Sequence, residues 1–264
     1  MLDSARRDAA QALLRSYEDG RPIGRLSTAH PGLDVEDAYA IQLEQVSAWR
    51  SAGRTVAGHK VGLTSLAVQR QLGVDQPDFG HLFHDMFVLS GEPIPAGTFL
   101  QPRVEPEIAF VLGRDLAGPG VTVADAIRAV DIVVASLEIV DSRITDWDIT
   151  LSDTIADNAS SGGVVLGTLP RSPRELDLRL LGAVLYRNGR IAHTGAGASV
   201  LGSPISSLVW LANTLGRLGT SLRAGQVVLP GAITPMVPGR PGDTVTAVFA
   251  GLGSVTARFA PALG

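Results

Sequence analysis

The chain has 264 residues, 45% of them hydrophobic, which is enough to bury one large core or a main domain with a smaller appendage. Its formal net charge is -4, and its 22 basic and 26 acidic residues are spread along the sequence, so no basic stripe favours nucleic-acid binding. Because cysteine is absent, disulfides, thiolate nucleophiles, iron–sulfur clusters and cysteine-based zinc sites are excluded.

The N-terminal part is predicted to be helical. Residues 2–17 are rich in Ala, Leu and Arg, and a second helical segment follows Asp34, which can cap it, and continues through Trp49. Gly20 and Gly53 mark the ends of the two helices. The charged N-terminus has no apolar signal-peptide core, and no later apolar run is long enough to cross a bilayer. We therefore expect a cytoplasmic protein that does not enter membranes.

From Thr55 the pattern changes to short β-like runs separated by glycine and proline. A composition shift near residue 75 divides the chain into an α-rich N-terminal region, residues 1–75, and a β-rich domain, residues 76–264. The strands expected up to residue 169 cover residues 55–63, 86–89, 99–112, 132–144 and 163–169. Between them, Thr122 can cap a short helix that reaches Val130.

The C-terminal third is mostly β. Asn188-Gly189 between two apolar runs is typical of a type I′ hairpin, and a helix is expected over residues 205–218. Further strands are predicted over residues 226–229, 243–249 and 254–259. Because strands and helices do not alternate regularly, an α+β fold with a mixed or antiparallel β core is favoured over a doubly wound parallel sheet.

Glu105 and Glu107 are the first candidates for chemistry. Side chains alternate along a strand, so the two carboxylates share one face, opposite Val104 and Ile108. Their repulsion in a half-buried strand would need a cation or solvent to compensate it. A solvated strand face is the commoner explanation of Glu-x-Glu alone. Pro106 between them predicts a sheet edge or an irregularity.

Glu138 strengthens the case for a metal because it lies inside an apolar strand-like run, where an unpaired carboxylate is costly. Three carboxylates without a thiolate make a hard oxygen site that suits Mg²⁺ or Mn²⁺. The alternative is an ion pair between Glu138 and an arginine such as Arg103 or Arg143.

Lys60 is unusual because it lies in a short apolar strand between Gly58 and Gly62. A desolvated lysine near a metal would have a lowered pKa and suit proton transfer; a snorkelling surface lysine is the equal alternative. Asp78, in an apparent loop, is either a turn former or an accessory to catalysis. The spacing of His81 and His84 allows metal ligation, but no further ligand nearby completes such a site.

Residues 153–163 form a polar, small-residue segment that either lines a pocket or ends a helix. The sequence contains no Gly-x-Ser-x-Gly elbow and no P-loop, and residues 195–200 fail the spacing of a dinucleotide-binding loop. Hydride transfer and triad hydrolysis are therefore disfavoured.

Taken together, these segments resemble the 2-keto-4-pentenoate hydratase family of the fumarylacetoacetate-hydrolase-like superfamily, which also contains 4-oxalocrotonate decarboxylases. The resemblance covers nearly the whole chain, and residues 143–149 favour the hydratase branch. It rests on six segments that occur together in this order: residues 58–62, 76–80, 102–107, 137–139, 153–161 and 229–231.

The resemblance implies a β-rich catalytic domain, a mixed β-sheet roll, with a smaller N-terminal helical region, assembled into a homo-oligomer. It implies Mg²⁺ or Mn²⁺ on Glu105, Glu107 and Glu138. The expected reaction adds water to 2-hydroxypenta-2,4-dienoate, as in aromatic-compound catabolism. Lys60 and Asp78 are then expected to transfer protons. Asn158 and Ser160 are expected to form hydrogen bonds with the substrate or with the attacking water.

Three rival functions stay open at this point. The first is a 4-oxalocrotonate-type decarboxylase, since loss of carbon dioxide can give the same chelated enolate, and a cation that pairs with a second carboxylate would support it. The second is hydrolysis of a carbon–carbon bond in an acylpyruvate. The third is a catalytically silent subunit in complex with a related decarboxylase.

Overall fold

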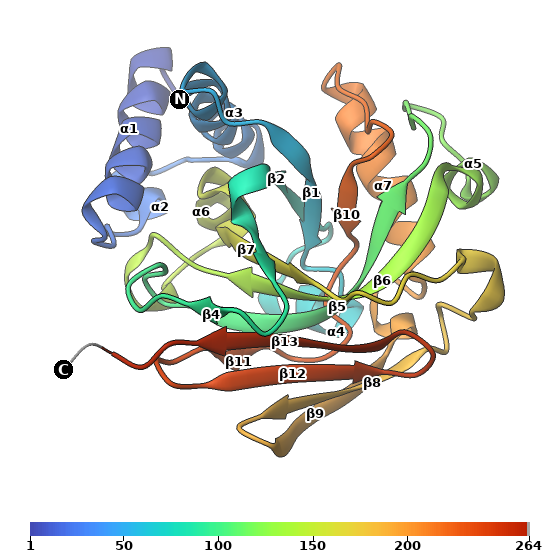
Figure 1. The fold of residues 1–264 in the computed structure, drawn as a ribbon. Coiled ribbons are helices and arrows are strands. Elements are labelled where there is room, and N and C mark those ends of the chain that lie inside the picture. The colour runs from blue at the N-terminus through green and yellow to red at the C-terminus, as the bar shows by residue number, and fades with distance from the viewer. Residues whose placement is uncertain (263–264) are drawn as a thin grey trace.

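Two β-sheets and two groups of helices make up the computed structural model, which describes residues 1–262 apart from the side chains of residues 71 and 72 (Figure 1). The eight-stranded sheet curls above the five-stranded sheet, α1 and α3 flank it at one end, and α5 and α7 flank it at the other. The helices are α1 (Asp3–Asp19), α2 (Leu26–Ala29), α3 (Val35–Ser51), α4 (Leu66–Leu72), α5 (Val123–Ala129), α6 (Leu151–Ala156) and α7 (Pro204–Arg217).

The larger sheet has the order β2-β1-β10-β5-β6-β7-β3, with β11 also paired to β5. Strands β1 and β10 are parallel, as are β3 and β7, and the other pairs are antiparallel. Its strands are β1 (Val56–Gly62), β2 (Asp78–Phe83), β3 (Phe87–Leu89), β5 (Arg103–Leu112), β6 (Val130–Val140), β7 (Ser161–Leu166), β10 (Val227–Leu229) and β11 (Val237–Pro238). The predicted mixed β core of an α+β fold is confirmed.

The smaller sheet has the order β4-β13-β12-β8-β9. The predicted hairpin joins β8 to β9, and Asn188 and Gly189 both have positive φ, as a type I′ turn requires. The strands are β4 (Pro93–Ile94), β8 (Gly182–Arg187), β9 (Arg190–Ala196), β12 (Thr244–Phe249) and β13 (Gly253–Phe259).

The main core lies between the two sheets and extends under α5 and α7. Strand alternation sends Val104, Ile108 and Phe110 of β5 into this core, where all three are fully buried. Glu105 and Glu107 therefore face the opposite side of the sheet, which also carries a smaller apolar cluster around Ala109, Val134, Val164 and Leu229. The fold thus places the two carboxylates on the sheet face away from the main core.

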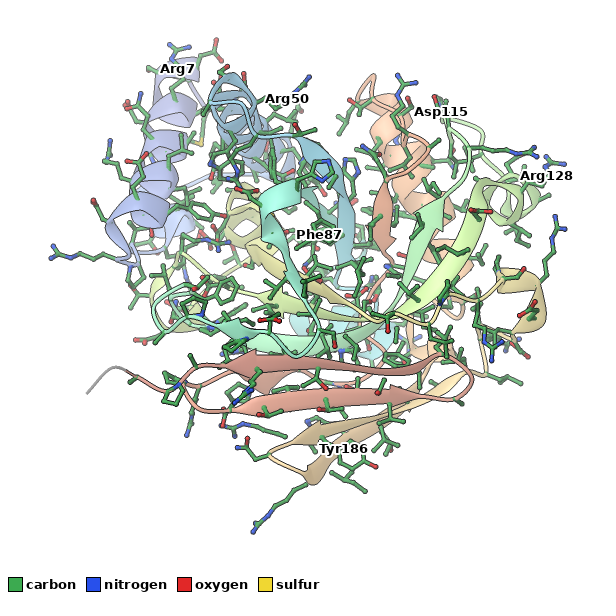
Figure 2. All side chains as sticks on the ribbon, viewed as in Figure 1. Arg7, Arg50, Phe87, Asp115, Arg128 and Tyr186 are labelled. Carbon is green, nitrogen blue, oxygen red and sulfur yellow. The ribbon has the colours of Figure 1, made fainter. Side chains whose placement is uncertain are left out.

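The N-terminal helices are anchored to the sheet by buried amides. Asp34 caps α3 by accepting a hydrogen bond from Asp37 N, as predicted. About two turns after the cap, Gln42 Nε2 donates to the carbonyl oxygens of Phe79 and Ile155. Figure 2 shows Arg7 and Arg50 on the outer surface of this helical layer, and both are exposed. The layer thus has a polar outer face and a buried inner face.

Three expectations need comment. The segment around Asp78 forms strand β2 rather than a loop, because it pairs with β1 along its length. Pro106 lies at an irregularity rather than at a free edge: β5 pairs with β6 past it, but β10 and β11 pair with β5 only to either side of it, and Pro106 O accepts a hydrogen bond from Ile233 N. A boundary at residue 75 stays a prediction, although β1, from the first part, lies between β2 and β10.

Within the described residues, no helix is both long and apolar enough to span a membrane.

Candidate metal centre and active-site pocket

Three glutamates meet on one face of the larger sheet. Glu105 and Glu138 are directly opposite each other on β5 and β6, and Glu107 lies two residues further along the same face of β5. One carboxylate oxygen from each lies within 4.8 Å of the others, a spacing that suits ligands of one cation. Glu107 and Glu138 are at most 1% exposed, whereas Glu105 is half-buried. The three acids that the sequence suggests as metal ligands therefore lie together in the structure, and their role as ligands stays a prediction.

Several carboxylate oxygens of this triad have no hydrogen-bond partner among the described residues. Glu107 Oε2 accepts a hydrogen bond of 2.6 Å from Gly231 N, but Glu107 Oε1 has no hydrogen-bond partner among the described residues, and neither does either oxygen of Glu138. Burial and the neighbouring carboxylates raise the pKa of Glu107 well above its usual value and that of Glu105 to about 7. Orphaned carboxylate oxygens in this arrangement fit a divalent cation.

Lys60 joins the triad from β1. Its Nζ lies 3.2 Å from Glu138 Oε1, an ion pair without good hydrogen-bond geometry, and donates a hydrogen bond of 2.9 Å to Ala159 O. The sequence predicts a lowered pKa for this lysine when it is desolvated beside a bound cation, and burial acts in that direction. The carboxylates of Glu138 and Asp78 outweigh it and raise the pKa of Lys60 above its usual value. Within the protein's own field this lysine is therefore a cation.

Asp78 lies beside Lys60 because Gly62 makes room for it. A Cβ at Gly62 would lie only 2.2 Å from Asp78 Oδ1 and 3.5 Å from Lys60 Nζ, so both polar groups converge over this glycine. Asp78 is 2% exposed, and its Oδ1 has no hydrogen-bond partner among the described residues. Burial raises the pKa of Asp78, against the opposing charge of Lys60. A buried carboxyl with a raised pKa suits proton transfer near neutral pH.

A left-handed turn, η3 (Asn158–Ser160), presents the carbonyl that binds Lys60. All three residues have φ between 51° and 53°, although none is glycine. The Asn158 side chain accepts a hydrogen bond from His81 N and donates one to His81 O, so both ends of its carboxamide are bonded within the protein. Ser160 is 3% exposed, and its hydroxyl lies 3.1 Å from Thr154 Oγ1. Asn158 thus fixes the turn rather than offering a free side chain.

A buried ion pair supports the same turn from behind. Arg143 Nε donates to Asp157 Oδ1 at 2.6 Å, and Arg143 N donates to Asp157 Oδ2 at 2.9 Å. The guanidinium also lies over the Tyr17 ring of α1 at 4.3 Å. Arg143 is therefore not the partner of Glu138 that the sequence allowed. Sequence analysis missed this pair, whose only local signal is a charged residue within an apolar stretch.

The two histidines considered as ligands do not share a site. His81 is buried on the opposite face of β2, where His81 Nδ1 lies 3.1 Å from Gln42 Oε1, while His84 is exposed. His59 of β1 lies directly opposite His81, with ring centroids 4.9 Å apart. The side chains of His81 and His84 therefore do not converge on one point.

A pocket of about 500 Å³ opens onto the triad at Glu105. Its apolar walls come mainly from the end of β1, from α4 and from residues 232–236, and several hydroxyl groups interrupt them. Of the described residues that line it, none is basic. The residues that line the pocket besides Glu105 are Val61, Gly62, Leu63, Thr64, Ser65, Val68, Thr194, Gly195, Ser199, Ala232, Ile233, Thr234, Pro235 and Met236.

A sequence profile of the fumarylacetoacetate hydrolase C-terminal family matches residues 51–260, which is most of the chain. The chain belongs to the fumarylacetoacetate hydrolase family. The matched region begins just before β1, so it includes Lys60 as well as the three glutamates.

Curated relatives match almost the entire length. The chain is 51% identical to a 2-keto-4-pentenoate hydratase of Paraburkholderia xenovorans (strain LB400) over 98% of this chain and 96% of the relative. It is 43% identical to a 2-oxo-hept-4-ene-1,7-dioate hydratase of Escherichia coli over 95% of this chain and 96% of that one. Both relatives are named as hydratases.

A solved structure shares the complete fold. The 4-oxalocrotonate decarboxylase from Pseudomonas putida G7, complexed with magnesium and adipate, superposes with a TM-score of 0.95 and is 36% identical, with 98% of each chain covered. A second structure of that decarboxylase, complexed with calcium and acetate, superposes with a TM-score of 0.93. Divalent cations are thus bound by proteins of this fold.

Proposed function

We propose that the protein is a divalent-cation-dependent hydratase, a hydro-lyase, that converts 2-hydroxypenta-2,4-dienoate or a close analogue to 4-hydroxy-2-oxopentanoate. The observation that carries the proposal is the triad of Glu105, Glu107 and Glu138, with its orphaned oxygens, beside a pocket whose other lining residues are apolar or carry neutral hydroxyls. Full-length identity of 51% to a named hydratase supports the same reaction.

The triad would hold Mg²⁺ or Mn²⁺, because three carboxylates form a hard oxygen site. When bound, the cation supplies positive charge that orients a 2-oxo or 2-hydroxy acid and stabilises its enolate. Magnesium in the decarboxylase neighbour supports this assignment, and manganese is the second candidate.

Lys60 and Asp78 are the proposed proton-transfer residues. In net terms, hydration moves the proton of the 2-hydroxyl group to C5, then adds the hydroxyl of water at C4 and the remaining proton of water at C3, so one water is consumed. Asp78 suits the proton-carrying role because burial raises its pKa, while protonated Lys60 suits stabilisation of negative charge at the substrate oxygens. Ala159 O and Glu138 hold the Lys60 ammonium in place.

Asn158 is proposed to have a positioning role, because its two hydrogen bonds to the His81 backbone fix the turn that carries Ala159. Ser160 keeps a hydroxyl near Thr154 and is proposed to orient substrate or water. A homo-oligomer, a cytoplasmic location and a complex with a related decarboxylase remain predictions.

The decarboxylase alternative is not favoured. A second substrate carboxylate would call for a cation in the pocket wall, and none of the described lining residues is basic. Among the three rivals, the silent-subunit reading is disfavoured by the intact arrangement of triad and lysine.

The test follows loss of the dienoate absorbance by purified protein, with product identification by mass. We expect gain of one water with Mg²⁺, no turnover with EDTA, and a loss of kcat/KM of about 100-fold or more for both Lys60→Ala and Asp78→Asn. Wild-type kcat/KM in both variants would refute the proton-transfer roles. Release of carbon dioxide from 2-oxohex-4-enedioate, without hydration of the dienoate, would instead establish the decarboxylase.

A further inference from the structure

Leu63 borders two separate pockets. It lines the pocket of about 500 Å³ that opens onto Glu105, and it also lines a second pocket of about 410 Å³. The second pocket is otherwise lined by Val74 and by residues at the start of α6, namely Ile149, Thr150, Leu151, Ser152 and Thr154. Among the described residues, Leu63 is the one that lines both pockets, so this residue lies between them.

The backbone of Leu63 is held in an unfavourable conformation. Its φ is 53°, in the left-handed region that is unfavourable for a residue with a Cβ and accessible to glycine. A hydrogen bond of 2.6 Å from Gln69 Nε2 to Leu63 O ties this residue to α4. Because glycine would fit this backbone without strain, a branched side chain here points to a function for the side chain itself.

Apart from Glu105, the residues that line the two pockets have the same chemical character. Apolar side chains and neutral hydroxyls line them, and none of the described lining residues of either pocket is basic. Arg103 contacts the rim residue Met236 but stacks on Trp147, with its guanidinium 4.3 Å from the ring centre. A substrate tail in these pockets would therefore be uncharged, because a buried carboxylate would lack a partner.

We propose that Leu63 is a specificity-determining residue that separates the substrate pocket from a reserve pocket and so limits the length of the substituent on the dienoate. The proposal rests on the proposed hydratase function. It assigns the substrate class as 2-hydroxy-2,4-dienoates with a short, uncharged, apolar 5-substituent. Shortening Leu63 would join the two pockets and admit a longer alkyl tail, but not a tail that ends in a carboxylate.

The test compares kcat/KM of the Mg²⁺-loaded protein for three substrates: 2-hydroxypenta-2,4-dienoate, 2-hydroxyocta-2,4-dienoate and the eight-carbon diacid 2-hydroxyocta-2,4-diene-1,8-dioate. In Leu63→Ala we expect the ratio for the eight-carbon monoacid over the parent to rise by about tenfold or more, since each methylene buried in an apolar pocket contributes about 10-fold or more to discrimination. The ratio for the diacid should not rise. Leu63→Gly, which also relieves the positive φ, should act in the same direction.

The matched control is Ile149→Ala, which enlarges only the second pocket and leaves the dividing side chain in place. Its substrate ratios should equal those of the wild type. Unchanged ratios in both Leu63 variants, or an equal rise in Ile149→Ala, would overturn the proposal.

Failure of the hydratase assignment has a different signature. It would appear as no hydration of the parent dienoate by the wild-type protein. The dividing role of Leu63 is then tested by calorimetric binding of 2-oxooctanoate and 2-oxopentanoate to the same variants. The ratio of the two dissociation constants should again shift about tenfold in Leu63→Ala, and an unshifted ratio would overturn the proposal.

Discussion

At the scale of single residues, Glu105 shows how a binding site can weaken the fold that carries it. Burial and the charge of Glu138 raise the pKa of Glu105 to about 7, whereas an unfolded glutamate ionises near 4.5. Without a cation, the free energy of unfolding therefore falls as the pH rises from about 4.5 to about 7, because the unfolded chain releases this proton first, and the loss is complete above pH 7. We expect Glu105→Gln to stabilise the protein in EDTA by about 1–2 kcal/mol, after allowance for solvent screening of this half-buried group.

The measurement is thermal unfolding of wild type and variant in EDTA and in Mg²⁺. Mg²⁺ should raise the Tm of the wild type and leave that of Glu105→Gln nearly unchanged. Glu92→Gln, at an exposed glutamate outside the triad, serves as control and should respond to Mg²⁺ like the wild type. Equal stabilisation of Glu105→Gln and wild type by Mg²⁺ would remove Glu105 from the proposed ligand set.

Some residues of the site can be identified from the sequence, and the surroundings of others cannot. The shared face of Glu105 and Glu107 follows from strand alternation, which is a local rule, and an acid inside an apolar run marks Glu138. The environment of Asp78 was missed because it depends on pairing between β1 and β2 and on the space over Gly62. Such contacts join residues far apart in sequence, so no local pattern predicts them.

At the scale of elements, the left-handed turn η3 is the part of the site that we expect to depend most on buried hydrogen bonds. Asn158→Ala would leave His81 N and His81 O without their side-chain partners in a buried setting, which costs about 2–4 kcal/mol. The turn would relax and Ala159 O would move away from Lys60. We therefore expect lower kcat with a smaller change in KM, measured alongside urea unfolding.

Ala159→Gly is the matched comparison for this turn. It keeps the carbonyl that accepts the hydrogen bond from Lys60 and removes the Cβ that makes a φ of 51° unfavourable. Its stability and kcat should stay close to the wild-type values. If Asn158→Ala kept wild-type kcat while losing stability, the turn would be a structural support without influence on Lys60.

Sequence patterns located most elements but not their assembly. The helix capped by Asp34 and the Asn188-Gly189 hairpin were predicted because capping and turn residues act locally. The turn at Asn158 was not, since three non-glycine residues with positive φ have no sequence signature and persist only through the tertiary contacts around them.

At the scale of the whole molecule, assembly depends on how distant segments share one sheet. Strand β1 lies between β2 and β10, although β10 follows it by well over a hundred residues, and hydrophobic periodicity alone cannot specify that neighbour. Composition suggests a division at residue 75. Composition alone does not show that β1 brings Lys60 close to the glutamates of later strands. The sequence thus predicts the fold class and the candidate residues, while the contacts among those residues depend on strand order.

The sheet and the N-terminal helices meet at a buried histidine pair, which should make the whole molecule sensitive to acid. Burial lowers the pKa of His81 to about 4 and that of His59 well below its usual value of 6.5, and neither ring nitrogen of His59 has a hydrogen-bond partner among the described residues. The unfolded chain therefore binds more protons below pH 6.5, so these groups reduce stability progressively as the pH falls from 6.5 toward 4.

We expect His59→Leu to unfold in urea much like the wild type at pH 8 and to be more stable than it by about 2 kcal/mol at pH 5, because the variant has one fewer buried group to protonate. The triad carboxylates titrate in both proteins, so their opposite pH dependence largely cancels in the difference. His84→Asn, at an exposed position, should show no such divergence. A difference between His59→Leu and wild type that stayed constant from pH 8 to pH 5 would mean that His59 accepts a proton in the folded protein as readily as in the unfolded chain.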